Sequence, residues 1–189
     1  MADFRKPLLL MPLVALALAG AHVGYEFFHG GVKTHHFLAR GDLPGFSNWL
    51  GLVILPLLGL AFGLRLGQAE GGDRGSRGSG LWPVLRAGPR PWVGLVAALA
   101  HGAALAASFH WGQESLSLAL FAGLFLAAAM LPVYRAEYLL GFVLGMMLIF
   151  GSVIPLAFAL FFAMASFVLR RAAAWGIVAL RTMARRNRP

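Results

Sequence analysis

The side chains of this sequence that could do acid–base or metal chemistry begin with a group of three near the N-terminus. His22, Glu26 and His29 are spaced four and three residues apart, which places them on one side of an α-helix of 3.6 residues per turn. Imidazoles and carboxylates bind divalent metals without thiolates, and the chain has no cysteine. The spacing therefore predicts a polar stripe suited to a divalent metal ion, Zn or Fe.

Further histidines and carboxylates extend this candidate site. An Ala-His pair occurs at His22 and again at His101, each followed seven or nine residues later by a Phe-His pair, so both histidines are expected at similar depth and facing each other. A haem between His22 and His101 is the second choice of cofactor. The expected metal ligands are His22, Glu26, His29, His35, His36, His101 and His110, and the expected acid–base groups are Glu26, Asp42 and Glu114.

The elements that must position these residues are apolar helices. The chain has 59% hydrophobic and only 12% charged residues, with a mean hydropathy of +0.75, whereas a soluble domain has about 25% charged residues. This composition excludes an ordinary soluble domain and predicts an all-α, polytopic integral membrane helix bundle formed as a single domain by residues 1–189. The apolar windows are 8–28, 49–66, 92–110, 116–134 and 138–169.

The last window decides the number of membrane spans. Its 32 residues would form one helix about 48 Å long, which exceeds an upright span. Gly151 and Ser152, followed by Pro155, form the natural point of interruption, because proline lacks an amide donor and disfavours helix in the residue before it. Six transmembrane helices are therefore predicted, with five helices, or four plus a re-entrant hairpin, as alternatives.

Arginine distribution predicts the orientation. The net charge is +9, and the positive residues gather at the N-terminus, in 65–90 and in 170–188, which indicates that these segments are cytoplasmic.

Residues 68–80 are expected to be a flexible linker and 170–189 a basic tail, either an amphipathic helix on the membrane surface or a continuation of the last span. The N-terminal run resembles a secretory signal, but it continues to Phe28 and is expected to remain as an anchor. The Ala-, Leu- and Arg-rich composition favours a bacterial inner (plasma) membrane.

Three classes of function remain open. The first expectation is a metal-dependent membrane enzyme that acts on a lipid or small molecule through an outward-facing His/carboxylate site. The second is a proton- or metal-coupled transporter or channel, with a helix broken between Gly151 and Pro155. The third is a non-catalytic or haem-binding subunit that packs against partners, a second copy of itself included, through Gly141, Gly145 and Gly151. Nucleic acid is not an expected partner, because nothing in the chain builds a recognition module.

Overall fold

The computed structural model describes residues 5–36, 40–42, 44–72 and 90–186. The regular secondary structure of these residues is helical apart from one short hairpin. Strand β1 (Thr34–His36) pairs antiparallel with β2 (Gly45–Ser47), and the 3-10 helix η2 (Asn48–Leu50) follows directly. The α-helices of the described residues are α1 (Arg5–Phe28), α2 (Gly51–Gly72), α4 (Pro91–His110), α5 (Glu114–Met130), α6 (Ala136–Phe150) and α7 (Val153–Arg186).

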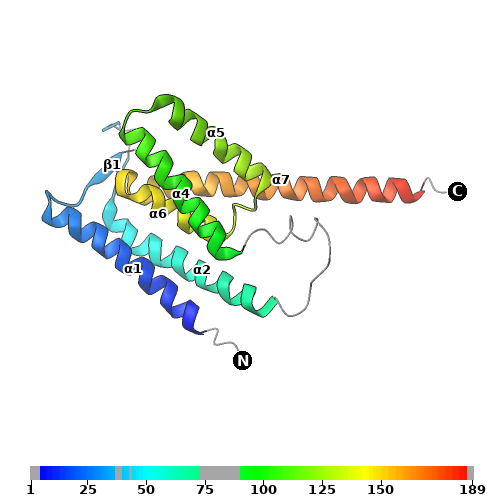
Figure 1. Ribbon diagram of the computed structural model, residues 1–189, viewed down its shortest axis with the longest axis horizontal. Coiled ribbons are helices and arrows are strands. Elements are labelled where there is room, and N and C mark those ends of the chain that lie inside the picture. Colours follow the sequence, from blue (N-terminus) through cyan, green and yellow to red (C-terminus); the bar gives the residue numbers. More distant parts are fainter. Residues whose placement is uncertain (1–4, 37–39, 43, 73–89, 187–189) are drawn as a thin grey trace.

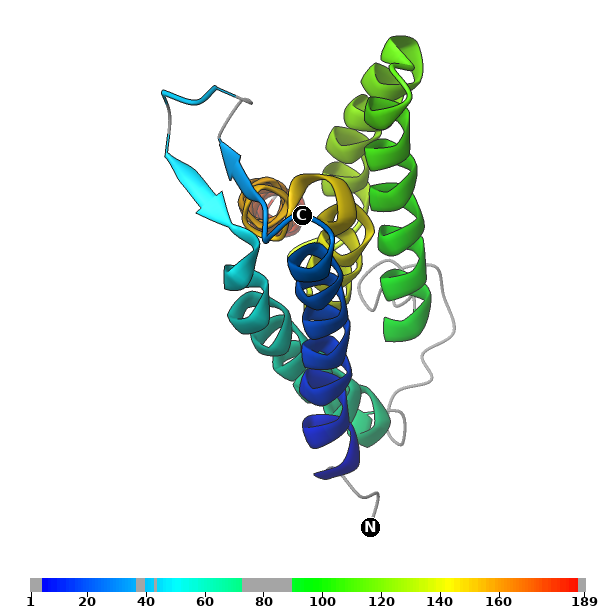
Figure 2. The same ribbon diagram turned by 90° about the vertical axis from the view of Figure 1, so that its left-hand side faces the viewer.

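Successive helices run in opposite directions (Figure 1). The helices α1, α4 and α6 run towards the end of the bundle that carries the hairpin, and α2, α5 and α7 run away from it. At the end of the bundle opposite the hairpin therefore lie the start of α1, the end of α2, the start of α4 and the end of α7. The closest packing is between α1 and α2 and between α4 and α6, with α2 joining the two pairs through α6. Figure 2 shows the bundle from the hairpin end, with α7 seen along its axis.

Four of these helices are long and apolar enough to cross a membrane, over Lys6–Phe28, Asn48–Ala69, Pro91–His110 and Val153–Gly176. Many large apolar side chains on them are exposed, for example Leu13, Leu57 and Val96, as expected for surfaces that face lipid. The apolar helices α5 and α6 have 17 and 15 residues, or about 25 and 22 Å, which is short of the roughly 30 Å hydrocarbon core. The fold is thus compatible with a membrane helix bundle, and six crossings remain a prediction.

The apolar window 138–169 divides where its sequence indicates. Helix α6 ends at Phe150 and α7 begins at Val153. Gly151 between them has a φ of +68°, a conformation that is strained for residues with a Cβ atom. Pro155 falls in the first turn of α7, where its missing amide hydrogen breaks no helical hydrogen bond. The alternative of one continuous helix through this window is therefore wrong.

Glycines bring α4 and α6 into backbone contact. A Cβ atom at Gly141 would collide with the carbonyl oxygen of Leu95, and one at Gly145 would collide with that of Leu99. On the other side of the same interface, a Cβ atom at Gly102 would lie 2.7 Å from the carbonyl oxygen of Phe142. The expectation that Gly141 and Gly145 serve contacts with partner proteins is therefore corrected: they pack α6 against α4 within this chain.

The expected linker and tail also need correction. Helix α2 continues to Gly72, so residues 68–72 are helical and do not belong to a linker; 73–80 lies outside the described residues. The basic tail continues α7 as one helix to Arg186, which agrees with the second of the two alternatives. The final part of α7 extends beyond the other helices (Figure 1), and Trp175 on it is largely exposed.

Candidate functional site

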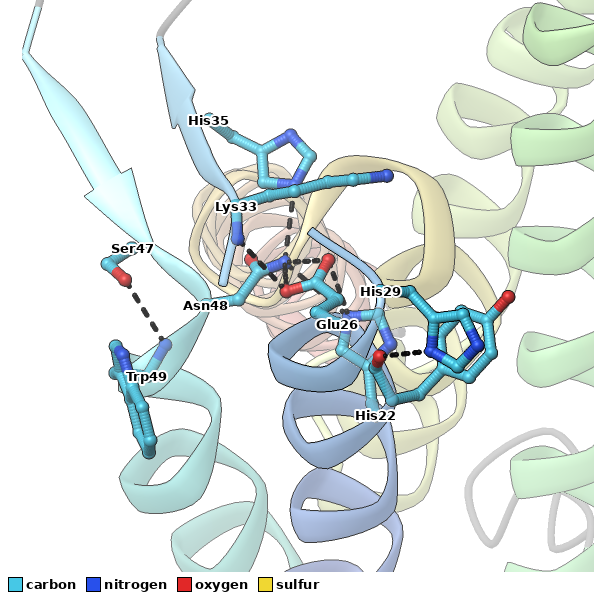
Figure 3. Close-up of polar contacts among 9 residues, drawn as sticks. His22, Glu26, His29, Lys33, His35, Ser47, Asn48 and Trp49 are labelled. Atoms are coloured by element: carbon cyan, nitrogen blue, oxygen red, sulfur yellow. Dashed lines mark hydrogen bonds and ion pairs between the residues drawn. The ribbon is translucent and has the colours of Figure 1, made fainter. Parts of the chain in front are cut away.

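A buried carboxylate lies at the centre of the hairpin end of the bundle. Glu26, in the last turn of α1, is only 5% exposed. Its two carboxylate oxygens lie 2.8 and 3.0 Å from Nδ2 of Asn48, which donates to them, and Oε2 also accepts from the backbone N–H of Lys33 at 3.2 Å (Figure 3). Hydrogen bonding offsets much of the cost of burying such a group.

Two histidines complete this group, which we call the Asn48 cluster: His22, Glu26, His35 and Asn48. The same Nδ2 atom of Asn48 lies 3.3 Å from Nε2 of His35 and 3.5 Å from Nε2 of His22. An amide nitrogen carries only two hydrogens. In the tautomers that leave both Nε2 atoms without a hydrogen, four acceptor atoms therefore surround a group that can satisfy two of them.

Local backbone geometry brings the cluster together. Gly30 and Gly31, with φ values of +116° and +97°, reverse the chain directly after α1. The hairpin then places His35 opposite Phe46, and the Asn48 N–H donates to the carbonyl oxygen of Lys33 at 3.0 Å, which seats Asn48 beside Glu26.

The break between α6 and α7 closes the cluster from the other side. A Cβ atom at Gly151 would collide with Oδ1 of Asn48 and lie 2.9 Å from Cδ2 of His35. Glycine at this position therefore allows the α6–α7 turn to approach the amide and the imidazole closely.

Two other histidines expected at this site make different contacts. His29 is exposed, stacks on Tyr25 with ring centroids 4.1 Å apart, and bonds through Nδ1 to the Tyr25 carbonyl oxygen at 2.8 Å. Figure 3 shows its ring directed away from Asn48. His36 lies opposite Gly45 in the hairpin. Of the three residues of the expected stripe, the structure thus joins His22 and Glu26 and leaves His29 outside.

The expected acid–base groups other than Glu26 also lie elsewhere. Asp42 is exposed and forms an ion pair with Arg40 at 2.8 Å, and this hydrogen bond lowers the pKa of the Asp42 carboxyl below its usual value. Glu114 begins α5 and lines a cavity of about 580 Å³ between α4 and α5. His110, at the end of α4, is exposed and contacts the ring of Trp111.

His101 does not meet His22, which corrects the expectation drawn from the repeated motif. Nε2 of His101 lies 3.1 Å from the carbonyl oxygen of Leu120 in α5, and its ring lines a cavity among α4, α5, α6 and α7 that His22 does not reach. The reason is packing: α1 lies mainly against α2, whereas α4 lies mainly against α6. Similar depth along two helices does not make their residues neighbours.

The described part of the chain contains no group of three or more His, Cys, Asp or Glu side chains arranged to hold a metal ion. In the Asn48 cluster, the amide nitrogen occupies the space between the candidate ligands. Its distances to their atoms are 2.8–3.5 Å, whereas Zn lies about 2.0–2.2 Å from nitrogen and oxygen ligands. The arrangement as it stands is a hydrogen-bonded cluster.

Asn48 was not among the residues expected at the site from the sequence; the neighbouring Ser47 caps η2 by accepting a hydrogen bond from the Trp49 N–H. It also gave no role to Glu137, which is fully buried in α6 with Oε1 3.8 Å from Nε of Arg65 in α2. The available signal for Glu137 was a single carboxylate at the edge of a long charge-free window. The sequence spacing between Arg65 and Glu137 does not predict that the two side chains lie opposite each other.

Acidification should loosen the hairpin through His35. Burial lowers the pKa of His35 below 6.5; Lys33 and His22 lower it further, and Glu26 acts in the opposite direction. The unfolded chain therefore binds the proton more tightly than the folded chain. The contribution of a neutral His35 to stability is complete above pH 6.5 and is lost as the pH falls through the lower folded-state pKa.

Hydrogen exchange at the Asn48 amide, which is bonded to the Lys33 carbonyl oxygen, measures this effect. After correction for the intrinsic exchange rate, protection should decrease between pH 7.5 and 5 in the parent protein and change less in His35→Gln. Equal pH dependence in the two proteins would show that His35 is not the responsible group.

Comparisons with protein-family models, curated proteins and solved structures found no match to this chain.

Proposed function

We propose that this chain is a multi-pass protein of the bacterial plasma membrane whose extracytoplasmic end binds a divalent metal ion, Zn or Fe, through His22, Glu26 and His35. The observation that carries the proposal is the convergence of one carboxylate and two imidazoles on the single amide nitrogen of Asn48. The alternating helix directions support the orientation, since they separate the hairpin from the ends of α2 and α7, which adjoin the arginine-rich segments (Figure 1).

In this proposal the Asn48 amide occupies the position of the cation. Metal binding requires the Asn48 side chain to turn away and the three ligands to move inward by about 1 Å, to the usual metal–ligand distances. The lowered pKa of His35 supports the role, because a metal binds the neutral form of imidazole. Glu26 supplies the negative charge that the metal needs.

The geometry favours ion binding over catalysis on a lipid or small molecule. Of the expected acid–base groups, Asp42 is paired with Arg40 at the surface and Glu114 lines a cavity between α4 and α5. Neither side chain contacts the Asn48 cluster in the described structure. We therefore favour an ion-coupled transporter or channel, with the enzyme and the haem-binding subunit as alternatives.

A proton is the second candidate cation, because a hydrogen on Nε2 of one imidazole would turn that atom from an acceptor into a donor beside the Glu26 carboxylate. The two candidates differ in what they require of Asn48. A metal ion must replace the amide at the centre of the cluster. A proton on Nε2 of His22 would instead leave Asn48 in place and strengthen the contact between His22 and Glu26, whose atoms Nε2 and Oε1 lie 3.7 Å apart.

Titration of the detergent-purified protein with Zn²⁺ and Fe²⁺ tests the proposal. We expect one site per chain, and we expect Glu26→Gln to weaken binding roughly 100-fold or more, since loss of a ligand exceeds the 10- to 100-fold effect of losing a supporting residue. Asn48→Ala should bind the metal at least as tightly as the parent, because it removes the group that occupies the site. His29→Ala is the matched control and should leave affinity unchanged.

Absence of saturable metal binding by the parent protein, with protein yield unaffected, would overturn the metal proposal. Equal affinity in Glu26→Gln and the parent would show that metal binds elsewhere. A pH-dependent change in the fluorescence of Trp49, present in the parent and lost in Glu26→Gln, would then assign the cluster to proton binding.

A further inference from the structure

Two arginines of α7 make specific contacts where the α5–α6 turn meets this helix. Nη1 of Arg170 donates to the carbonyl oxygen of Met130, the last residue of α5, at 3.2 Å. The guanidinium of Arg171 lies over the ring of Phe167, 5.4 Å from its centroid, and the ring of Tyr134 in the turn contacts the same phenylalanine. We call Tyr134, Phe167, Arg170 and Arg171 the α7 arginine site.

The stacked position of Arg171 suits it to bind an oxyanion. A cation–π contact uses the face of the guanidinium, whereas the five N–H groups lie in its plane and match the oxygens of a phosphate. Arg171 is exposed and forms no hydrogen bond or ion pair with the residues that the structure describes. Arginines that only orient a helix in the membrane need no particular contacts, so a stacked and oriented guanidinium indicates a binding role.

The local charge also favours an anion. Arg170 and Arg171 are adjacent in sequence, and Arg135 at the end of the α5–α6 turn adds a third positive charge. Among the side chains that the structure describes, Glu137 is the only carboxylate at this end of the bundle, and it is fully buried. An anion bound at the surface would therefore reduce the repulsion between the guanidinium groups.

The surface around the site fits a lipid. Arg171 lies 18 residues after Val153, or about 27 Å along α7, which is close to the roughly 30 Å thickness of the hydrocarbon core. Phe161, Met164 and Val168 precede Arg171 by ten, seven and three residues, which places them on its side of the helix, and all three are exposed. An acyl chain can lie along this apolar side while a phosphate meets the arginines.

We propose that the α7 arginine site binds the phosphate of an anionic phospholipid, through the guanidinium groups of Arg170 and Arg171 with the Tyr134 hydroxyl as a further donor. Membrane proteins bind such head groups at basic sites between helices on the cytoplasmic side. A free phosphate ester offers the same anion but makes no use of the apolar side of α7. The proposal does not depend on the metal site.

Lipid titration of the full-length protein in detergent tests the proposal, with bound lipid counted by native mass spectrometry. The probes are phosphatidylglycerol and phosphatidylcholine with the same acyl chains, and glycerol 3-phosphate as a competitor. We expect the parent to prefer phosphatidylglycerol at least fivefold. Arg171→Gln should weaken phosphatidylglycerol binding roughly fivefold, which is the contribution of about one basic residue near an anionic surface, and Arg171→Lys should weaken it less.

Arg40→Gln is the matched control, because it removes the same charge from an exposed arginine at the hairpin end; its affinity for phosphatidylglycerol should equal that of the parent. Arg171 is exposed, so Arg171→Gln should keep the melting temperature of the lipid-free parent. Equal affinities of the parent for the two lipids, or unchanged phosphatidylglycerol binding in Arg171→Gln, would overturn the proposal. Glycerol 3-phosphate that binds as tightly as phosphatidylglycerol would also overturn it, because the site would then belong to a free phosphate ester.

Discussion

Replacing Gly141 by valine is expected to prevent the chain from accumulating as folded protein. Any Cβ atom at this position collides with the carbonyl oxygen of Leu95 and lies 3.0 Å from Cβ of Ala98, so α6 would have to move away from α4. Because the obstacle is backbone, no side-chain rearrangement relieves it. We expect a loss of about 3 kcal/mol or more, at the upper end of overpacking effects.

The yield of monodisperse protein in detergent, together with its melting temperature, measures this loss. Gly141→Ala should show a smaller decrease of the same kind. Gly20→Ala on α1 is the control, because a Cβ atom there meets nothing within 4 Å, and alanine should stabilise the helix slightly. Normal yield and melting temperature for Gly141→Val would mean that α4 and α6 are not in backbone contact.

The second large effect is expected at the opposite end of the bundle from the hairpin. Arg65→Ala should destabilise the protein by about 3 kcal/mol, the lower end of the range for breaking a buried ion pair. The lower end applies because the Arg65 side chain is 25% exposed, whereas that of Glu137 is only 1% exposed. The variant would leave Glu137 charged and buried, and neither of its oxygens has a hydrogen-bond partner among the described residues.

A double variant separates this explanation from simple loss of packing. Adding Glu137→Gln to Arg65→Ala removes the unpaired charge and should restore most of the stability, as measured by the melting temperature in detergent. Arg90→Ala, which removes an exposed arginine before α4, serves as the control. If Arg65→Ala alone behaves like the control, the stability of the protein does not depend on the contact between Glu137 and the guanidinium.

The helices could be predicted from the sequence because their signals are local. Runs of apolar residues determine where a helix is compatible with lipid, and the boundary at Gly151 and Pro155 follows from backbone restrictions on those two residues alone. The prediction that residues 68–72 belong to a linker was wrong. It relied on the glycine content of this segment, but the glycines at its end are part of helix α2.

Within the candidate site, the contact between His22 and Glu26 was predictable, since residues four apart on a helix are neighbours. The addition of His35 and Asn48 was not. Their positions depend on the register of the β1–β2 hairpin and on the approach of Gly151 from the far end of the chain. A shift of the hairpin by one residue would reverse the faces of its side chains.

By itself, then, the sequence determined the helical segments, their interruption and the polar side of α1, because each depends on residues within a few turns of one another. Only the tertiary structure decided which distant residues meet. The pairing of α1 with α2 and of α4 with α6 separates His22 from His101, and the contact of α2 with α6 brings Arg65 to Glu137. Apolar helix faces of similar composition do not specify their neighbours, whereas the close approach of glycine backbones does.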